Sequence, residues 1–393
     1  MSKTEMPSIR FRGFDDAWEQ RKAKELFVST ADKGYPELPV LSATQDRGMI
    51  RRDENSINIF HDKKNEDGYK RVLPGQFVIH LRSFQGGFAH SAIEGITSPA
   101  YTVFGFSEPE KHDSEYWKYV FTSKSFIQRL ETVTYGIRDG RSISYEEFLT
   151  LGFVYPSKAE QTAIARYLDK LSDLITLHQR KFEKLTNVKK SILEKMFPRN
   201  GSSYPEIRFK GFTDPWEQRK FGEVATFING RAYSQPELLS SGKYKVLRVG
   251  NFYTNDSWYY SDLELGEKYY ADYGDLLYTW SATFGPHIWL GDRVIYHYHI
   301  WKISLSDQLE KQFAVQLLEQ DRANILSSKN GSTMVHITKE GMEQKDVIIP
   351  PSTKEQQKIG AFFSQLDDLI TLHQRELEKL QSIKKALLEK MFV

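Results

Sequence analysis

The chain has 393 residues, enough for two or three domains, and 39% of its residues are hydrophobic. Its formal net charge is +2, so a nucleic-acid surface would have to be a local patch on a nearly neutral domain. The absence of cysteine excludes disulfide frameworks, cysteine zinc sites and thiol nucleophiles. The first residues lack the apolar core of a signal peptide, and no apolar run approaches the roughly 18 residues of a membrane span. We therefore expect a soluble cytoplasmic protein.

The chain begins with a segment that is repeated later. The sequence IRFRGFDDAWEQRK, from Ile9, recurs as IRFKGFTDPWEQRK, from Ile207, at an offset of 198 residues. Such a repeat indicates that the globular domain following each copy is duplicated. The letters then diverge between about residues 28 and 135 and between 226 and 325. A shared frame with different interiors predicts two recognition modules with different targets.

Each domain is predicted to be a compact α+β unit. In the first, we expect strands at PVLSATQDRGMI and QFVIHLRSF and one amphipathic helix at YWKYVFTSKSFIQRLE. In the second, we expect strands at KVLRVGNFY, DLLYTWSATFG and VIYHYHIWKI, then a helix at LEKQFAVQLLEQDRANIL. Both domains close on a proline-marked strand, FVYPS or VIIPPS, immediately before a long helical stretch.

The long helical stretches are the strongest repeat in the sequence. Residues 160–197 and 355–392 align at an offset of 195 with 22 of 38 positions identical, and DLITLHQR is the same in both. Apolar residues recur at alternating steps of three and four, which is typical of a coiled-coil seam. The predicted seam consists of Ile164, Leu168, Leu171, Ile175, His178, Phe182 and Leu185 in the first helix, and Ile359, Phe363, Leu366, Ile370, His373, Leu377 and Leu380 in the second.

A whole domain separates the two helices, so the chain can go out along one and return along the other. We therefore expect an antiparallel coiled coil with a pseudo-two-fold relation between the halves, in which His178 lies near His373. The seam is polar at His178 and His373 and again at Lys189 and Lys384. Polar residues at such positions usually fix the register of a coiled coil, and we favour this role over a metal or catalytic one.

No catalytic signature is present. The sequence has no Walker phosphate loop, no GxGxxG, GxSxG or HExxH, and its only Pro-Pro pair lacks the flanking residues of a methyltransferase loop. His287, His297 and His299 form the nearest approach to a metal cluster, with the last two expected on one face of a strand. Without a carboxylate at ligand spacing, a polar or packing role is favoured over metal binding.

Several arginine, asparagine and glutamine side chains in expected loops are candidates for contacts to DNA. Such side chains reach base edges, whereas lysine and backbone amides beside glycine reach phosphates. The candidates are Arg47, Arg51, Arg52, Arg82, Gln85, Arg138 and Arg141 in the first domain, and Arg231, Arg248, Asn251, Thr283, Lys329 and Asn330 in the second. For any single one of them, a solvated surface position is the simpler interpretation.

With its helix repeats, proline-marked strands and twin IRF segments, the chain resembles the specificity subunit of type I restriction-modification enzymes. The resemblance covers essentially the whole chain. It implies a target-recognition domain at residues 1–157, a spacer helix at 158–198, a linker at 199–205, a second recognition domain at 206–352 and a second spacer helix at 353–393.

In that family, each domain reads one half of an asymmetric, gapped double-stranded DNA target, and the coiled coil sets the gap and docks two methyltransferase subunits. The resemblance also implies that motor and endonuclease subunits join the complex. This chain would then be non-catalytic and bind no cofactor, with S-adenosylmethionine, ATP and Mg²⁺ on its partners.

A duplicated coiled-coil adaptor that binds proteins is the alternative, and the near-neutral charge of both domains favours it. A DNA reader should lose affinity steeply with salt and prefer one sequence, whereas an adaptor should do neither.

Overall fold

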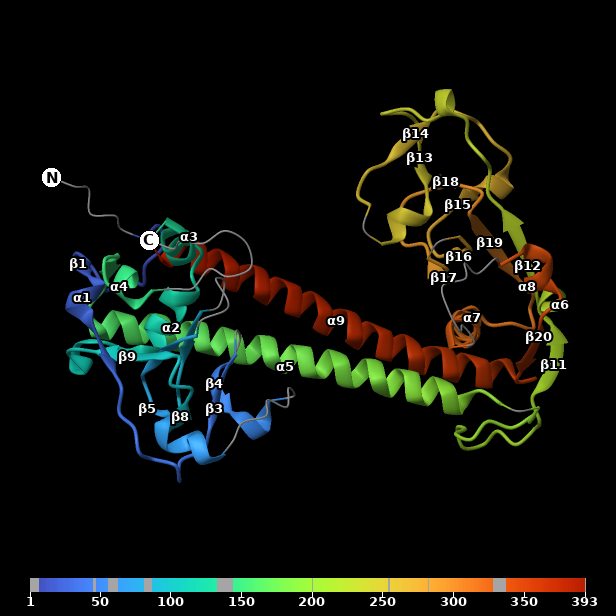
Figure 1. Cartoon of the computed structure of the whole chain (residues 1–393). Coiled ribbons are helices and arrows are strands. Elements are labelled where there is room, and N and C mark those ends of the chain that lie inside the picture. The colour runs from blue at the N-terminus through green and yellow to red at the C-terminus, as the bar shows by residue number, and fades with distance from the viewer. Residues whose placement is uncertain are drawn as a thin grey trace. The chain divides into compact units, whose positions relative to one another are not determined.

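The structure, a computed structural model, describes residues 7–44, 47–55, 63–80, 87–132, 144–199, 201–253, 255–281, 283–327 and 337–392. The chain forms two compact units (Figure 1). The first unit combines Met1–Gln179 with Arg375–Val393, and the second is Arg180–Gln374. Each unit therefore contains one globular domain and one stretch from each of the two long helices.

The first unit is built from antiparallel strand pairs and one four-stranded sheet. The proline-marked strand β10 (Gly152–Tyr155) pairs with β1 (Glu19–Lys22), which comes from the repeated N-terminal segment. The four-stranded sheet has the order β2-β9-β6-β7, with β2 Phe27–Thr30, β9 Thr102–Phe106, β6 Phe77–Ile79 and β7 Phe88–His90. The remaining pairs are β3 (Leu41–Thr44) with β4 (Gly48–Arg51) and β5 (Lys70–Val72) with β8 (Gly95–Thr97).

Two predictions for the first unit need correction. The stretch PVLSATQDRGMI is a hairpin, β3 and β4, rather than one strand. The expected single helix is two, α2 (Ser114–Thr122) and α3 (Lys124–Thr132), which meet at Ser123. The Ser123 hydroxyl donates to the Val120 carbonyl (2.7 Å) and accepts from the Phe126 N–H (3.2 Å), so it ends one helix and starts the next. Two short helices, α1 (Ala23–Leu26) and α4 (Tyr145–Phe148), complete the unit.

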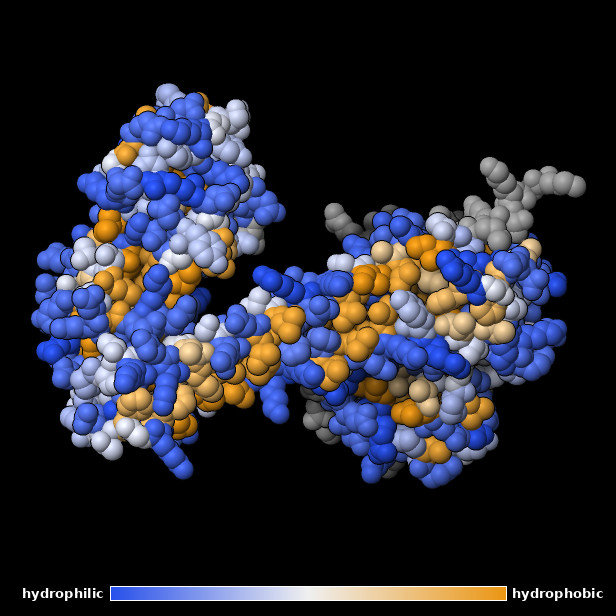
Figure 2. All heavy atoms as spheres, turned by 180° about the vertical axis from the view of Figure 1, so that it is seen from behind, coloured by the Kyte–Doolittle hydropathy of each residue, from blue (hydrophilic) through white to orange (hydrophobic). Residues whose placement is uncertain are grey.

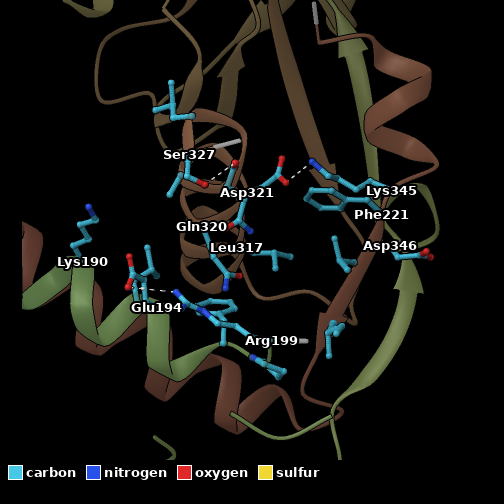
Figure 3. A pocket seen from close by; sticks show the side chains of 18 residues that line it. Lys190, Glu194, Arg199, Phe221, Leu317, Gln320, Asp321, Ser327, Lys345 and Asp346 are labelled. Carbon is cyan, nitrogen blue, oxygen red and sulfur yellow. Dashed lines mark hydrogen bonds and ion pairs between the residues drawn. The ribbon is translucent and has the colours of Figure 1, made fainter. Parts of the chain in front are cut away.

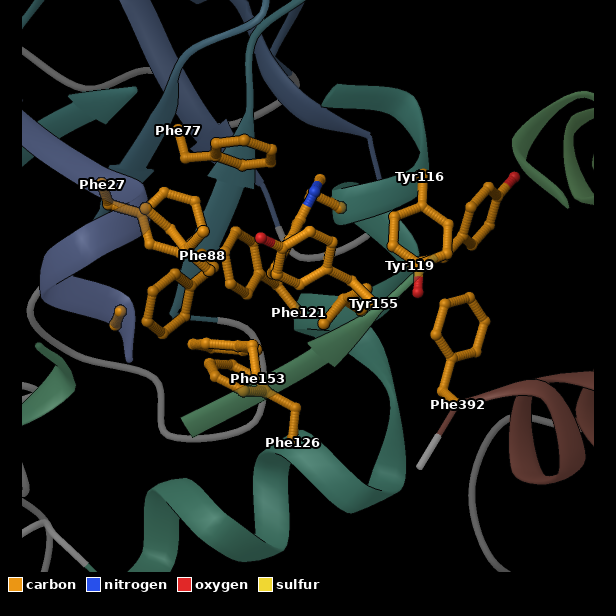
Figure 4. Packing of buried hydrophobic residues seen from close by; sticks show 14 of the residues in the cluster. Phe27, Phe77, Phe88, Tyr116, Tyr119, Phe121, Phe126, Phe153, Tyr155 and Phe392 are labelled. Atoms are coloured by element: carbon orange, nitrogen blue, oxygen red, sulfur yellow. The ribbon is translucent and has the colours of Figure 1, made fainter. Parts of the chain in front are cut away.

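Aromatic side chains fill the core of the first unit. Phe27, Phe88, Phe121 and Phe153 lie among buried rings contributed by the sheet, α2 and β10 (Figure 4). The Phe88 and Phe121 rings stack with their centroids 5.0 Å apart. Offset and edge-to-face ring pairs of this kind add to the stabilisation from burial alone.

The second unit repeats the topology of the first. Its four-stranded sheet β12-β19-β16-β17 corresponds to β2-β9-β6-β7, and β11 (Glu217–Lys220) pairs with β20 (Asp346–Ile349) as β1 pairs with β10. The strands of this sheet are β12 Ala225–Asn229, β19 Ile300–Leu305, β16 Leu276–Thr279 and β17 Gly285–Ile288. A second sheet, β14-β13-β18-β15, consists of β14 Tyr259–Ser261, β13 Tyr244–Leu247, β18 Val294–Tyr296 and β15 Tyr270–Ala271.

This second sheet also has a counterpart in the first unit. Strands β13 and β18 run parallel, and a parallel bridge between Val40 and Ile96 joins the β3–β4 and β5–β8 pairs in the same order. The topology is therefore kept where the sequences diverge. The helices of the second unit are α6 (Phe221–Val224), α7 (Lys311–Ser327) and α8 (Lys339–Glu343).

The stretch VIYHYHIWKI is not one strand, as we predicted, but two. Strand β18 ends at Tyr296 and β19 begins at Ile300, and the two belong to different sheets. His297 and His299 therefore lie in the turn between them and not on one face of a strand. The interruption arises because the chain leaves one sheet and enters the other within three residues.

The long helices α5 (Lys158–Met196) and α9 (Thr353–Met391) pair antiparallel. In the first unit, Leu380, Leu387 and Met391 from the end of α9 join the core that contains Ile164 and Leu168 from the start of α5. In the second unit, Leu193 and Met196 from the end of α5 join the core that contains Ile359 and Phe363 from the start of α9. The predicted fold class, two similar α+β domains with antiparallel long helices, is confirmed.

Burial along the seam is uneven. Ile164, Leu168, Leu171, Ile359, Phe363 and Leu377 are buried, whereas Ile175, His178, Phe182, Leu185, Leu366, Ile370, His373 and Leu380 are half-buried. The seam pattern predicts that Leu171, Leu185, Leu366 and Leu380 are buried; Leu171 is, and the other three are only half-buried. A second helix alone covers only one side of each side chain, and complete burial occurs mainly where a globular domain adds to the cover. His178 and His373 belong to different units, so their proximity stays a prediction.

The two lysines in the seam each bind the opposite helix. Lys189 forms an ion pair with Asp367 (2.6 Å) in the second unit, and Lys384 donates to Ser172 Oγ (2.8 Å) in the first. Lys189 and Lys384 occupy equivalent positions of the helix repeat, and so do Ser172 and Asp367. The equivalent contact is therefore made in each unit. A lysine that needs a particular partner disfavours other alignments of the helices, which agrees with a role in register.

The Glu-Gln pair at the start of each helix repeat is explained by twin contacts. Glu160 is completely buried and binds both Nε and Nη2 of Arg10 (2.7 and 2.8 Å). Glu355 binds Arg208 in the same way and at the same distances. Both arginines come from the repeated IRF segments, so each segment is fixed to the helix of its own half by a bidentate charge-assisted pair. We call these two pairs the arginine clamps.

The glutamine beside each glutamate fixes the helix to its domain. Gln161 accepts from the Asp113 N–H (2.9 Å) at the start of α2 and donates to the Pro156 carbonyl (2.8 Å) after β10. Gln356 makes the equivalent bonds to the Glu310 N–H (2.8 Å) and the Pro350 carbonyl (2.9 Å). The helix, a domain helix and the proline-marked strand are therefore held at one point in each unit.

Candidate nucleic-acid interface

Six of the predicted DNA-contacting residues lie outside the described residues, namely Arg82, Gln85, Arg138, Arg141, Lys329 and Asn330. Of the other seven, Arg51 is the last residue of β4, and the remaining six lie in turns and loops next to strands. Arg47 lies between β3 and β4, and Arg248 with Asn251 lies between β13 and β14. Because these two hairpins correspond in the shared topology, the candidates from the two domains fall in equivalent loops.

In the first domain, three arginines come from one hairpin and the turn after it. Arg47 is exposed, and its backbone N–H donates to Thr44 Oγ1 (3.1 Å) across the turn. Arg51 ends β4 and pairs with Asp53 (3.2 Å) at the surface. Arg52 Nε and Nη1 are buried and have no hydrogen-bond partner. Buried guanidinium groups without acceptors are uncommon, so among the described residues Arg52 has unused donors next to Arg51, whereas Arg47 lies at the turn of the hairpin.

In the second domain, Arg231 and Arg248 lie close to one turn. Arg231 pairs with Glu237 (2.6 Å) and lies over the Tyr233 ring, 5.1 Å from its centroid. Arg248 lies over the Tyr259 ring, 4.3 Å from its centroid. Cation–π contacts and an ion pair hold these guanidinium groups in place. Even so, Arg231 Nη1 and Arg248 Nε are buried and have no hydrogen-bond partner in the described part of the chain.

Asn251 and Thr283 differ in what they offer a ligand. Asn251 accepts from the Arg248 N–H (3.0 Å) and donates to the Asn255 and Ser257 carbonyls (2.9 and 3.0 Å). Its amide is therefore used within the loop, which favours a structural role for this candidate. Thr283 lies in the exposed β16–β17 loop.

His297 and His299, to which sequence reasoning gave little weight, lie beside Arg231 and Arg248. The turn from His297 to His299 is held by backbone bonds from His297 N–H to the Leu247 carbonyl (2.9 Å) and from Tyr298 N–H to the Arg231 carbonyl (3.0 Å). The Trp280 indole N–H donates to the Tyr298 carbonyl (2.9 Å). Loops that follow β12, β13, β16 and β18 therefore meet at one place.

Burial lowers the pKa of His287, His297 and His299 in the second domain, which favours their neutral form. Desolvation by burial, helped by the nearby His299 and Arg248, lowers the pKa of His297 to about 4. Burial, with a smaller contribution from Arg322, lowers the pKa of His287 to about 4. His287 stacks on Phe252 (4.1 Å between centroids) and bonds Tyr253 (3.1 Å). Within the described residues, no group of three or more potential ligands is arranged to hold a metal ion.

A cavity of about 950 Å³ lies elsewhere in the second unit (Figure 3). It is enclosed by the end of α5, by α7 and by β20, and its wall carries the ion pairs Lys345–Asp321 and Arg199–Glu194 (3.5 Å). None of the predicted DNA-contacting residues lines it. The candidate interface is therefore a set of surface loops and not a deep pocket. No helix in the described part of the chain is long and apolar enough to span a membrane.

The comparisons with known proteins agree with this arrangement. Residues 213–382 match the family described as the type I restriction modification DNA specificity domain. The chain is 21% identical over 416 residues to the putative type I restriction enzyme MjaX specificity subunit of Methanocaldococcus jannaschii, covering 98% of this chain and 94% of that protein. It is 23% identical over 254 residues, 59% of each chain, to the MjaVIII specificity subunit of the same organism.

Solved structures share the fold. The crystal structure of the type I restriction-modification S subunit from M. genitalium aligns with a TM-score of 0.59 and 16% identity over 99% of both chains. A chain from a structural study of complex assembly and conformational transition in the type I R-M system aligns with a TM-score of 0.54 and 15% identity, over 96% of this chain and 98% of that one.

The chain thus combines a duplicated α+β domain, antiparallel long helices and paired arginine-bearing loops, and the proteins that it resembles are type I specificity subunits. The family model thus matches residues 213–382, and the relatives extend the likeness to 98% of the chain. The resemblance predicted from the sequence, to a type I specificity subunit, is confirmed.

Proposed function

We propose that each globular domain reads one half of an asymmetric, gapped double-stranded DNA target, and that α5 and α9 set the gap. The observation that carries this proposal is the repeat of one topology with different loop side chains, each copy fixed to the long helices by the same arginine clamp. A shared frame gives both domains the same attachment, and different loops give them different sequences to read.

Contacts to the bases read the sequence, whereas contacts to the phosphates hold the protein on the DNA. Arg47, Arg51 and Arg52 in the first domain, and Arg231 and Arg248 in the second, are candidates for base or phosphate contacts. The near-neutral domains need such local groups, because phosphate contacts supply most of the sequence-independent affinity for DNA. Buried donors without partners, as in Arg52 and Arg248, support a ligand that brings acceptors.

The same proposal covers the partners. Two methyltransferase subunits dock on the paired helices, and motor and endonuclease subunits join through the complex. Exposed leucines support a docking surface, since Leu174, Leu177, Leu369 and Leu372 are 42–51% exposed on α5 and α9. Hydrophobic side chains reach the surface along these helices (Figure 2). S-adenosylmethionine, ATP and Mg²⁺ act on the partner subunits, and this chain neither methylates nor cuts DNA alone.

The test is methylome sequencing of a host with and without the gene. We expect one bipartite, gapped motif to lose methylation when the gene is deleted and to regain it on complementation. A purified complex of this chain with its methyltransferase subunits should bind that motif with an affinity that falls steeply with salt. An unchanged methylome together with salt-insensitive, sequence-independent binding would favour the protein-binding adaptor.

Helix length offers a second test. One heptad inserted into each long helix adds about 10.5 Å of rise and keeps the seam in phase. We expect the lengthened chain to accept a gap wider by about one to three base pairs or to lose binding, because base pairs are about 3.4 Å apart. Full activity with an unchanged gap would show that the helices do not set the spacing.

A further inference from the structure

We propose that the turn His297–Tyr298–His299 reads base edges in the half of the target recognised by the second domain. We call these three residues the reader turn. The inference rests on the proposed function and goes beyond it by assigning sequence discrimination to specific side chains. It is carried by three observations, namely how rigidly the turn is held, what its side chains expose and which groups beneath it lack partners.

Backbone bonds fix the turn from three directions. Besides the bonds to Leu247 and Arg231, the Arg231 N–H donates to the Tyr296 carbonyl (3.1 Å) and the Trp280 N–H to the His299 carbonyl (3.2 Å). Gly230 passes so close that an added Cβ would collide with the His297 carbonyl oxygen. A turn whose backbone groups are satisfied internally can present its side chains in one geometry, which sequence discrimination requires.

The side chains of the turn form a continuous polar and aromatic surface. The Tyr298 ring lies against both imidazoles, with centroids 4.4 Å from His297 and 3.9 Å from His299. Trp280 meets His299 edge-on at 5.1 Å and supports it from the β16 side. Tyr298 is 39% exposed. The His299 ring is half-buried, with its centroid 4.9 Å from that of His297.

Around the turn lie three buried donors that have no partner among the described residues. They are Arg231 Nη1, Arg248 Nε and the Tyr233 hydroxyl. The Tyr233 ring stacks with His297 (6.4 Å between centroids), and the Arg231 guanidinium lies over that ring. Unsatisfied buried donors are costly, and several at one place indicate acceptors that arrive with a ligand.

The chemistry suits the major groove of duplex DNA. A neutral imidazole offers one donor and one acceptor, and base edges in that groove present distinct patterns of donors and acceptors. The two arginines beside the turn supply cationic donors for base or phosphate oxygens. A protein ligand is less favoured, since the exposed surface of the turn is mainly polar rings rather than an apolar patch.

The experiment uses the full chain, co-expressed with the methyltransferase subunits of its host, carrying His297→Ala, His299→Ala or Tyr298→Phe. Tyr273→Ala is the matched control, because Tyr273 is 75% exposed and precedes β16, at the end of that strand opposite to Trp280. Methylomes give the motif of each variant. Selection from DNA with a fixed first half and a randomised second half gives the binding preference.

We expect the reader-turn variants to relax one or two positions of the second half-site, lowering discrimination there about tenfold, with the first half and the gap unchanged. The Tyr273→Ala chain should keep the wild-type motif. An unchanged preference in all three variants, or a loss of binding that is equal for all sequences, would overturn the assignment. A wild-type chain that directs no sequence-specific methylation would instead contradict the proposed function.

Discussion

The two globular domains share a topology and differ in what they do with aromatic residues. The first buries a dense cluster of phenylalanines under its four-stranded sheet. The second also has an aromatic core, but it places Trp280, Tyr298 and two histidines at the surface where four loops meet. The residues that repeat between the domains, in contrast, are those of the clamps and helix ends. The repeated residues are thus those that attach each domain to the helices, and the residues that differ are those of the exposed loops.

The largest expected effect tests the arginine clamps. Glu160→Ala or Glu355→Ala would leave Arg10 or Arg208 largely buried without its partner, at a cost of about 3–5 kcal/mol to the unit concerned. The cost should be higher in the second unit by about 1 kcal/mol, because Glu355 also accepts from the Trp216 indole N–H (3.3 Å). The Trp18 indole N–H of the first unit is buried without a partner.

Hydrogen exchange of peptides from each unit would measure both losses separately. The double variant Arg208→Met with Glu355→Leu is the control, since it removes the charge and its partner together and should recover most of the loss. Equal protection in wild type and both single variants would show that the clamps do not hold the domains to the helices.

The second prediction compares equivalent seam positions. Leu171 is 7% exposed within the first core, whereas Leu366, its counterpart in the repeat, is half-buried. We expect Leu171→Ala to destabilise the first unit by about 2–4 kcal/mol and Leu366→Ala to destabilise the second by roughly half of that. Urea denaturation followed by circular dichroism would measure both. Equal costs would mean that the seam is covered evenly along its length.

The third prediction concerns pH. An unfolded histidine has a pKa of about 6.5, and burial holds His287 at about 4 in the folded chain. The unfolded chain therefore takes up the proton first as pH falls. The free energy of unfolding of the second unit keeps this contribution in full above about pH 6.5 and loses it as pH falls towards 4. At pH 5 we expect a loss on the order of 1–2 kcal/mol in the second unit. His287→Gln should remove this part of the pH dependence. The same change of melting temperature with pH in wild type and variant would contradict the prediction.

The smallest effect separates structure from recognition within the second domain. Asn251→Ala removes the bonds to Asn255 and Ser257, so it should cost about 1 kcal/mol in stability and leave the methylated motif unchanged. Thermal melts and the methylome of the variant would check the two parts. A changed second half-site with unchanged stability would return Asn251 to the set of base-contacting candidates.

Sequence reasoning was most successful for the parts that repeat. The long helices, their antiparallel pairing and the proline-marked strands follow from periodicity and from two copies of one motif. The breaks at Ser123 and at His297–His299 were missed, because a single hydroxyl or a change of sheet leaves the hydrophobic pattern almost intact. The seam lysines were recognised as irregular, but their partners, Asp367 and Ser172, depend on the alignment of two distant segments.

The candidate interface was predicted less completely than the fold. Arg231 and Arg248 were selected by residue type alone, and their unpaired buried nitrogens could be found only from three-dimensional contacts. The histidines received little weight because a metal site needs ligands that the sequence does not place nearby. Their neutral rings and the backbone bonds around them depend on four loops meeting, which no local pattern encodes.

The order in which the first unit acquires its residues has a consequence for biosynthesis. Its core includes Met391 and Phe392, and the Phe392 ring lies 5.5 Å from that of Tyr116. The 195 residues of the second unit are translated in between, which takes roughly 10–40 s at about 5–20 residues per second. The domain made first is therefore expected to wait on the ribosome with part of its aromatic core uncovered. The domain made second finds Met196 and Phe197 already synthesised and can close its core as soon as its own segment of α9 emerges.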